Sequence, residues 1–169
     1  LMPDDHRSGD DVVTDPAVVA AFREMMNSKV EGAHTLALGT MGFRDIYSKR
    51  EIHRLDDLKN VKVRVQATAT EDTMFPAYGA QTIHMPFGDV YTSLQTGVVE
   101  AAENGINVYQ MNKHYEVAPT MSLTEHEANN NVIWVSDKVW NSLADDQKRW
   151  VQAAADEVGR TMPDKAFGL

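Results

Sequence analysis

The sequence predicts an α/β fold, because segments with the periodicity of strands alternate along the chain with segments that have the periodicity of helices. The clearest strand covers residues 61–65, where three valines on one face alternate with Lys62 and Arg64 on the other. The clearest helix covers residues 145–160, and its apolar face consists of Trp150, Val151, Ala154, Ala155 and Val158. No repeat or low-complexity tract interrupts this alternation.

The other elements follow from caps, turn residues and short apolar runs. The first is a helix at 14–26, with Thr14 or Asp15 as its cap and Pro16 in its first turn. A loop at 42–49 is expected between a buried strand at 34–41 and the valine strand. Further along we expect a helix at 70–79 that ends at Gly79, a strand at 81–85, a helix at 88–97, and strands at 98–102, 120–126 and 131–136.

Composition limits the possible functions. A chain of 169 residues can form one domain or two smaller lobes, and its 43% hydrophobic and 24% charged residues are ordinary for a globular protein. No apolar run approaches the roughly 18 residues of a membrane span. The formal charge of -9 disfavours nucleic acid as a partner.

Without cysteine there is no disulfide or thiolate site. Residues 1–11 are polar and loop-like, with no visible signal peptide.

An Asn-Gly pair follows the apolar run at 98–102 and marks a turn. Three interpretations are open for this turn: a catalytic Glu103, an Asn104 that hydrogen-bonds a ligand, or an ordinary connection from a strand to a helix. Glu103 and His126 could form an acid/base pair. However, the sequence has no phosphate loop and no nucleophile elbow, and Asn130 stands where a zinc protease helix would need a second histidine after His126. We therefore expect a non-enzyme without cofactor or metal.

Four blocks occur in a characteristic order: GFRDIYSKREIHRLDDLKNVKVRVQ, GAQTIHMPFGDVYTSLQTGVVEAAEN, HYEVAPTMSLTEH and WVSDKVWNSLADDQKRWVQAAADE. From about residue 30 to its end the chain resembles the solute-binding subunit of tripartite ATP-independent periplasmic (TRAP) transporters. In that family an Asp-Leu-Lys segment leads to an arginine that clamps a ligand carboxylate, which implies this role for Arg64. The matching segment DVYTSLQTGVVEAAEN implies that Asn104 is a ligand contact.

The resemblance implies further site residues, each of which has a simpler alternative. Arg44 matches an arginine near the cleft entrance, although a loop arginine usually faces solvent. Phe87 matches a residue that packs on the ligand, or it is a core phenylalanine. Glu103 is expected to accept from ligand hydroxyls or to brace Arg64. His126 matches a histidine that lines the cleft, or it is a buried structural residue.

The implied fold is that of a two-lobed periplasmic binding protein. Residues 1–41 would be part of the first lobe and the crossover, 42–129 the second α/β lobe, and 130–169 the return strand and helix of the first lobe or hinge. The family pattern differs at position 60, where Asn60 replaces a glycine and can also adopt a left-handed turn. It differs again at Gln66, which stands in place of a proline and offers another polar contact. First-lobe elements before Leu1 and after the last helix are expected to lie outside this sequence.

The implied function is that of an extracytoplasmic receptor, exported with a signal peptide that is then removed. It would bind an organic acid and deliver it to membrane permease subunits. We expect a sugar acid such as a uronate or aldonate, because the run AENGINVYQMNKHYEVAPTMSLTEH resembles members that bind sugar acids more than those that bind C4-dicarboxylates or sialic acid. A polar set could also meet several hydroxyl groups: Gln66, Glu103, His126 and Asn129–Asn131. The alternatives are a C4-dicarboxylate or another monocarboxylate, an enzyme using Glu103 and His126, and a lobe that binds nothing.

Overall fold

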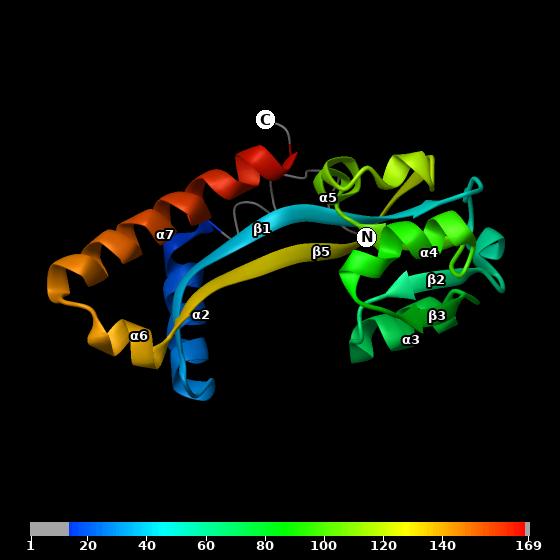
Figure 1. The fold of residues 1–169 in the computed structure, drawn as a ribbon. Helices are drawn as coiled ribbons and strands as arrows, with labels where there is room; N and C mark the ends of the chain where they lie inside the picture. Colours follow the sequence, from blue (N-terminus) through cyan, green and yellow to red (C-terminus); the bar gives the residue numbers. More distant parts are fainter. Residues whose placement is uncertain (1–13, 168–169) are drawn as a thin grey trace. The chain divides into compact units, whose positions relative to one another are not determined.

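The computed structural model describes residues 14–167, so the predicted loop at 1–11 lies outside the described part (Figure 1). These residues divide between two compact units, one within Leu1–Gly42 and Ala128–Leu169 and the other at Phe43–Glu127. All six predicted site residues lie in the unit Phe43–Glu127. The assignment of these units to the lobes of a binding protein stays a prediction.

A five-stranded sheet has the strand order β3-β2-β4-β1-β5. Strand β2 (Lys62–Val65) runs parallel to both β3 (Gln81–His84) and β4 (Ala101–Asn104), whereas β1 (Ala33–Ser48) runs antiparallel to β4. Strand β5 (Thr120–Ser136) lies at one edge. The mixed sheet with its helices confirms the α/β prediction.

The helices begin and end at the residues that their caps specify. Helix α2 (Pro16–Lys29) is capped by Asp15, whose carboxylate accepts from the backbone of Ala17 and Val18. Gly79 follows α3 with a φ of 85°, and Asn60 takes the left-handed conformation that its short amide side chain permits, with a φ of 62°. The remaining helices are α3 (Ala69–Ala77), α4 (Val90–Thr96), α5 (Ile106–Met111), α6 (Asp137–Ser142) and α7 (Asp145–Phe167), with short 3-10 turns at Leu55–Leu58, Phe87–Asp89 and His114–Glu116.

Two predictions about strands were wrong. The predicted loop at 42–49 is the second half of β1, because pairing from Asp45 with Asn104 to Ser48 with Ala101 gives this segment a partner strand. The two strands predicted near residues 120–126 and 131–136 are one continuous strand, β5. In both cases pairing with distant segments outweighed the local polar residues that looked like a loop.

The apolar face of the last helix is narrower than predicted, because only Val151 and Ala155 of the predicted set pack against the sheet. Trp150 and Val158 are 67% and 42% exposed, whereas the stripe that begins at Val151 and continues through Ala155 contacts β1 and β5. The close approach requires the glycine at the next turn, because a Cβ at Gly159 would lie 3.0 Å from the carbonyl oxygen of Leu38.

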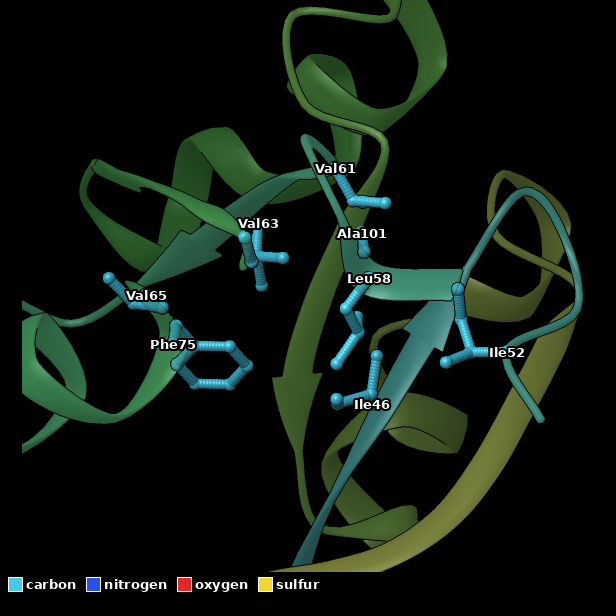
Figure 2. Close-up of a cluster of buried hydrophobic side chains, with 9 residues drawn as sticks. Ile46, Ile52, Leu58, Val61, Val63, Val65, Phe75 and Ala101 are labelled. Carbon is cyan, nitrogen blue, oxygen red and sulfur yellow. The ribbon is translucent and has the colours of Figure 1, made fainter. Parts of the chain in front are cut away.

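Each face of the sheet in the unit Phe43–Glu127 carries its own apolar cluster. One cluster includes Val63, Ile46 and Phe75 of α3 (Figure 2). The other includes Tyr47, Ala102 and residues of α4 and α5. Consecutive residues of one strand enter different clusters because side chains alternate across a sheet. The predicted common face of Val61, Val63 and Val65 is confirmed, since all three belong to the same apolar cluster.

We predict that Leu94→Ala lowers the free energy of unfolding by about 2–5 kcal/mol, because Leu94 is fully buried on α4 and truncation leaves a cavity. Leu123→Ala removes the same atoms from a side chain that is 73% exposed, and should change stability by less than about 0.5 kcal/mol. Denaturant unfolding measures both. Equal losses in the two variants would contradict the described core.

Candidate functional site

The candidate site lies where the parallel strands β2 and β4 end at the same edge of the sheet. Arg64 is in register with Ala102, so its side chain shares a face with Ala102 and, two residues on, with Asn104. Glu103 lies between those two residues and points to the opposite face. The six predicted site residues therefore form two groups, one on each side of β4.

Arg64 is 4% exposed and is held in a fixed orientation. Its Nε and Nη2 both donate to the carbonyl oxygen of Met85, at 3.2 and 3.0 Å. Its guanidinium carbon lies 5.9 Å from the ring centroid of Phe87, within the range of a cation–π contact. Phe87 is 39% exposed, which does not fit the alternative of a core phenylalanine. One edge of the guanidinium fork is thus anchored to the backbone and one ring lies beside it.

Near Arg64 lies a pair of residues that no sequence pattern marked. The Tyr47 hydroxyl lies 2.8 Å from Nδ1 of His114, and both residues are at most 2% exposed. The His114 ring also contacts Phe87, at 5.6 Å between centroids. Burial lowers the pKa of His114, and the charge of Arg64 lowers it further, which favours the neutral imidazole. No local signal marks either residue, because Tyr47 falls in the segment 42–49 that the sequence predicts as a loop, and His114 stands in a polar segment.

Asn104 is 7% exposed at the end of β4, and its side-chain oxygen accepts from the backbone N–H of Gly105 at 2.9 Å. Gly105 is the N-cap of α5 in an extended conformation. The turn therefore does connect a strand to a helix. Asn104 lies on the same face of the sheet as Arg64. Its role in ligand binding stays a prediction.

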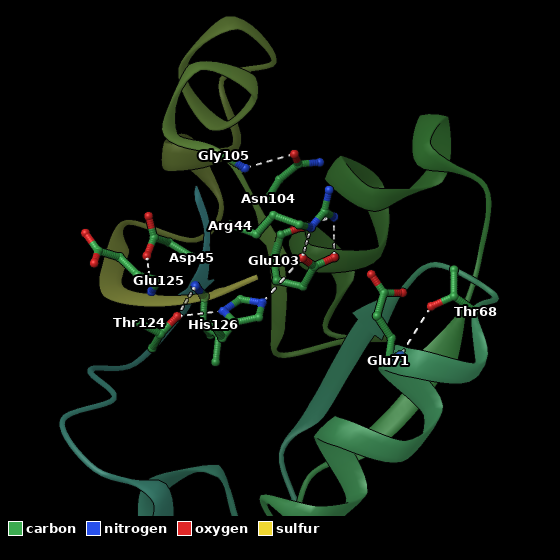
Figure 3. Close-up of polar contacts among 11 residues, drawn as sticks. Arg44, Asp45, Thr68, Glu71, Glu103, Asn104, Gly105, Thr124, Glu125 and His126 are labelled. Atoms are coloured by element: carbon green, nitrogen blue, oxygen red, sulfur yellow. Dashed lines mark hydrogen bonds and ion pairs between the residues drawn. The ribbon is translucent and has the colours of Figure 1, made fainter. Parts of the chain in front are cut away.

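On the opposite face lies a group that we call the Arg44 cluster, which consists of Arg44, Gln66, Glu71, Glu103 and His126; Figure 3 labels all of them except Gln66. Arg44 and Glu103 form a two-pronged ion pair, with Nε to Oε2 at 2.5 Å and Nη2 to Oε1 at 2.6 Å. The two side chains are 5% and 0% exposed. With its amide oxygen facing the guanidinium, Gln66 accepts from Nη2 and Nη1 at 3.0 and 3.2 Å. Arg44 is therefore not a solvent-facing loop residue.

Glu103 braces Arg44 and not Arg64, which corrects one of the two roles expected for it. Nε2 of His126 is 3.6 Å from Oε2 of Glu103, and its Nδ1 is 2.8 Å from the hydroxyl of Thr124. The His126 side chain is 5% exposed and its ring meets Phe75 edge-on. The structure thus places His126 as a buried member of the cluster.

Electrostatics hold Glu103 in the ionised form. Burial raises its pKa, but the contacts with His126 and Arg44 outweigh burial and leave the pKa below its usual value. The pKa of Arg44 is raised, because the partner carboxylate outweighs the effect of burial. A carboxylate engaged in this way is a weak general base, which argues against the acid/base alternative for Glu103 and His126.

Within residues 14–167, no group of three or more histidine or acidic residues is arranged to hold a metal ion. Over the same described range, no helix is both long and apolar enough to cross a membrane. Asn129–Asn131 belong to the other unit, so their grouping with Gln66, Glu103 and His126 stays a prediction.

Residues 3–166 match the family model described as bacterial extracellular solute-binding protein, family 7. The chain belongs to this family, which confirms the resemblance to TRAP solute-binding subunits and the extracytoplasmic location that it implied. This is a family of binding proteins and not of enzymes.

Two curated relatives illustrate the relationship. A solute-binding protein of Sulfitobacter sp. (strain NAS-14.1) is 36% identical over 118 residues, which are 70% of this chain and 36% of the relative. The sialic acid-binding periplasmic protein SiaP of Vibrio cholerae is 31% identical over 118 residues, which are 70% of this chain and 37% of the relative. The match with each of these two relatives thus spans little more than a third of the relative's length.

Solved structures of similar proteins carry sugar acids. A TRAP solute-binding protein from Sulfitobacter sp. with bound α-D-taluronate is 29% identical, with a TM-score of 0.85 over 96% of this chain and 52% of that one. One from Xanthobacter autotrophicus with bound β-D-galacturonate is 29% identical, with a TM-score of 0.86 over 99% and 55%. The protein DctPAm from Advenella mimigardefordensis, in complex with galactonate, is 30% identical, with a TM-score of 0.84 over 96% and 52%. This chain covers about half of each of these binding proteins, and the similarity confirms the fold class.

We predict that Glu103→Gln destabilises the protein by about 3–5 kcal/mol, because it leaves the buried Arg44 without its counter-charge. As the control, Glu157→Gln removes a carboxylate that pairs with Arg160 at 2.7 Å, where both side chains are at least 60% exposed, and should cost at most about 1 kcal/mol.

The Glu103 contribution should also depend on pH with a defined sign. Because the folded pKa is lowered, the stabilisation is present above the unfolded value of about 4.3 and is lost as pH falls through the folded pKa. Unfolding curves of wild type and Glu103→Gln should therefore converge in acid. Parallel pH profiles would contradict the ionised state of Glu103.

Proposed function

We propose that this chain is part of a TRAP receptor that binds a sugar acid, such as a uronate or an aldonate, through Arg64 and delivers it to membrane permease subunits. The observation that carries the proposal is the geometry of Arg64. Its Nε–Nη2 edge is anchored on Met85, which pre-orients the guanidinium so that its other edge can bind a carboxylate in the bidentate manner.

The surroundings of Arg64 suit a ligand with both apolar and polar parts. The partly exposed ring of Phe87 offers an apolar surface beside the guanidinium, and Asn104 offers an amide on the same face. Ligand sites usually combine an apolar wall with a few polar groups that fix orientation. Both residues are therefore proposed as contacts of the ligand, with Phe87 packing against carbon atoms and Asn104 supplying hydrogen bonds.

The Arg44 cluster is proposed to support the ligand site and not to clamp the carboxylate. Its arginine is already neutralised by Glu103, so a second carboxylate at Arg44 would have to displace that partner. Gln66 is the exposed member of the cluster and is the group we expect to meet a ligand hydroxyl.

Sugar acids are the preferred class because the solved structures named above carry a taluronate, a galacturonate and a galactonate. The shared element of these ligands is one carboxylate next to several hydroxyls. A C4-dicarboxylate or a simple monocarboxylate could also bind to an arginine fork, but would leave the hydrogen-bonding groups of Gln66 and Asn104 without hydroxyl partners.

The identity of the ligand can be tested by a thermal-shift screen on the receptor produced at the length of its relatives. We expect galacturonate or galactonate to raise the melting temperature more than succinate, pyruvate or the neutral sugar galactose, because only the sugar acids supply both a carboxylate and hydroxyls. Recovery of the acid unaltered is expected, since a receptor releases its cargo intact. A larger shift with succinate would replace the sugar acid by a dicarboxylate.

We further predict that Arg64→Lys sharply weakens binding, because an ammonium group cannot reproduce the two-pronged geometry. Arg64→Ala should cost about 2–5 kcal/mol of binding free energy, since it leaves the bound carboxylate unpaired. The control is Arg54→Lys, at a side chain that is 77% exposed, which should leave affinity unchanged. Calorimetry that finds wild-type affinity in Arg64→Lys would refute the clamp.

A further inference from the structure

Three buried polar atoms near the Arg44–Glu103 ion pair make no hydrogen bond among the described residues: Oε2 of Glu71, Oε2 of Glu127, and Nε2 of His126, which has only its ion-pair contact with Glu103 at 3.6 Å. Buried polar groups are nearly always paired, so such a concentration calls for a physical explanation. Glu71 is the most unusual of the three, because the whole residue is only 2% exposed. It lies on α3, outside the set of residues assigned to the ligand.

The local sequence would allow Glu71 a different and more ordinary position. Thr68 caps α3 by accepting from the backbone N–H of Glu71 at 3.2 Å, and a Thr-x-x-Glu pattern normally completes a reciprocal capping box. The backbone N–H of Thr68 donates to the carbonyl of Gln66 instead, at 2.9 Å. The Glu71 side chain is turned inward, toward the ion pair (Figure 3).

Glu71 and Glu103 both face Arg44, but only Glu103 occupies its guanidinium fork. The charged or titratable groups that face Glu71 are Arg44 from β1, Glu103 from β4, and Glu127 and the neighbouring His126 from β5. The Arg44 fork is occupied by both oxygens of Glu103. A second ionised carboxylate in this buried place would repel Glu103 without a counter-charge of its own.

We propose that Glu71 is held as a neutral carboxylic acid beside an ionised Glu103, and that it acts as a positioning residue that leaves the Arg44 fork to Glu103 alone. A neutral acid is a hydrogen-bond donor, whereas a carboxylate would compete for the guanidinium. Burial raises the pKa of Glu71 and the charge of Glu103 raises it further; these effects outweigh Arg44 and the backbone N–H of Gln66, which lower it, and the net direction agrees with this assignment.

Glu71 and Glu103 should then respond differently when each is replaced by glutamine. Glu71→Gln imitates the protonated acid and should leave the melting temperature within about 2 °C of wild type at neutral pH, whereas Glu103→Gln should lower it by about 10 °C. An equal fall in both variants, or a Glu71→Gln protein that does not fold, would show that Glu71 is ionised and overturn the proposal.

The pH dependence provides a second readout. A carboxyl with a raised folded pKa binds its proton more tightly in the native state, so stability falls as pH rises from the unfolded value of about 4.3 through the folded pKa. Glu71→Gln should remove this fall, and a wild-type pH profile in that variant would overturn the proposal. NMR of wild type labelled with carbon-13 in its glutamate carboxyls should show one glutamate that titrates above the others; its absence would also count against Glu71.

The consequence for binding rests on the proposed function, but the tests above do not. Galacturonate affinity in Glu71→Gln should stay within about threefold of wild type at neutral pH, and should decline less at alkaline pH, where an ionised Glu71 would draw Arg44 away from Glu103 and Gln66. A tenfold loss at neutral pH would refute the positioning role. If no sugar acid binds the wild type, the proposed ligand fails while the stability and NMR results still decide the state of Glu71.

Discussion

The alternation of side chains along β4 organises the whole unit Phe43–Glu127. This strand has four residues, all buried, and it lies between β1 and β2 in the sheet. Ala101 and Glu103 enter one face, where α3 and Arg44 lie, and Ala102 and Asn104 enter the other, with Tyr47 and Arg64. A shift of one residue in register would exchange these faces and place a carboxylate beside Arg64. The functional division between the two groups of polar residues is therefore a direct result of strand geometry.

The Arg44–Glu103 pair illustrates what buried charges do for such a sheet. Removing two charges from water costs several kcal/mol per ion, so the pair adds little net stability compared with well-packed apolar residues. The observed register of β1 against β4 pairs Ile46 with Glu103 and brings the Arg44 fork to the carboxylate. The apolar clusters on the two faces pack around this strand pair.

The parts of the fold that depend on local patterns could be read from the sequence, whereas the parts that depend on distant contacts could not. The valines of β2, the Asp15 cap and the turn at Gly79 carry their own signals in neighbouring residues. The second half of β1 carries none, because its strand character comes from pairing with β4, more than fifty residues later. The same limit applies to the site: alternation placed Arg64 on a polar face, but the burial that orients it comes from Met85, Phe87 and His114, which no local pattern connects to it.

The division of the chain into two units also separates its aromatic chromophores. The three tryptophans, Trp134, Trp140 and Trp150, all belong to the unit that contains Ala128–Leu169, and the five tyrosines, at positions 47, 78, 91, 109 and 115, all belong to Phe43–Glu127. Selective excitation of tryptophan thus reports on one unit, and tyrosine absorbance reports on the other. In this chain all five tyrosines belong to the unit that contains Arg64, and Tyr47 lies on the same face of the sheet as Arg64. Fluorescence excited at the red edge of the tryptophan band can therefore follow the unit that contains Ala128–Leu169 by itself, without any added label.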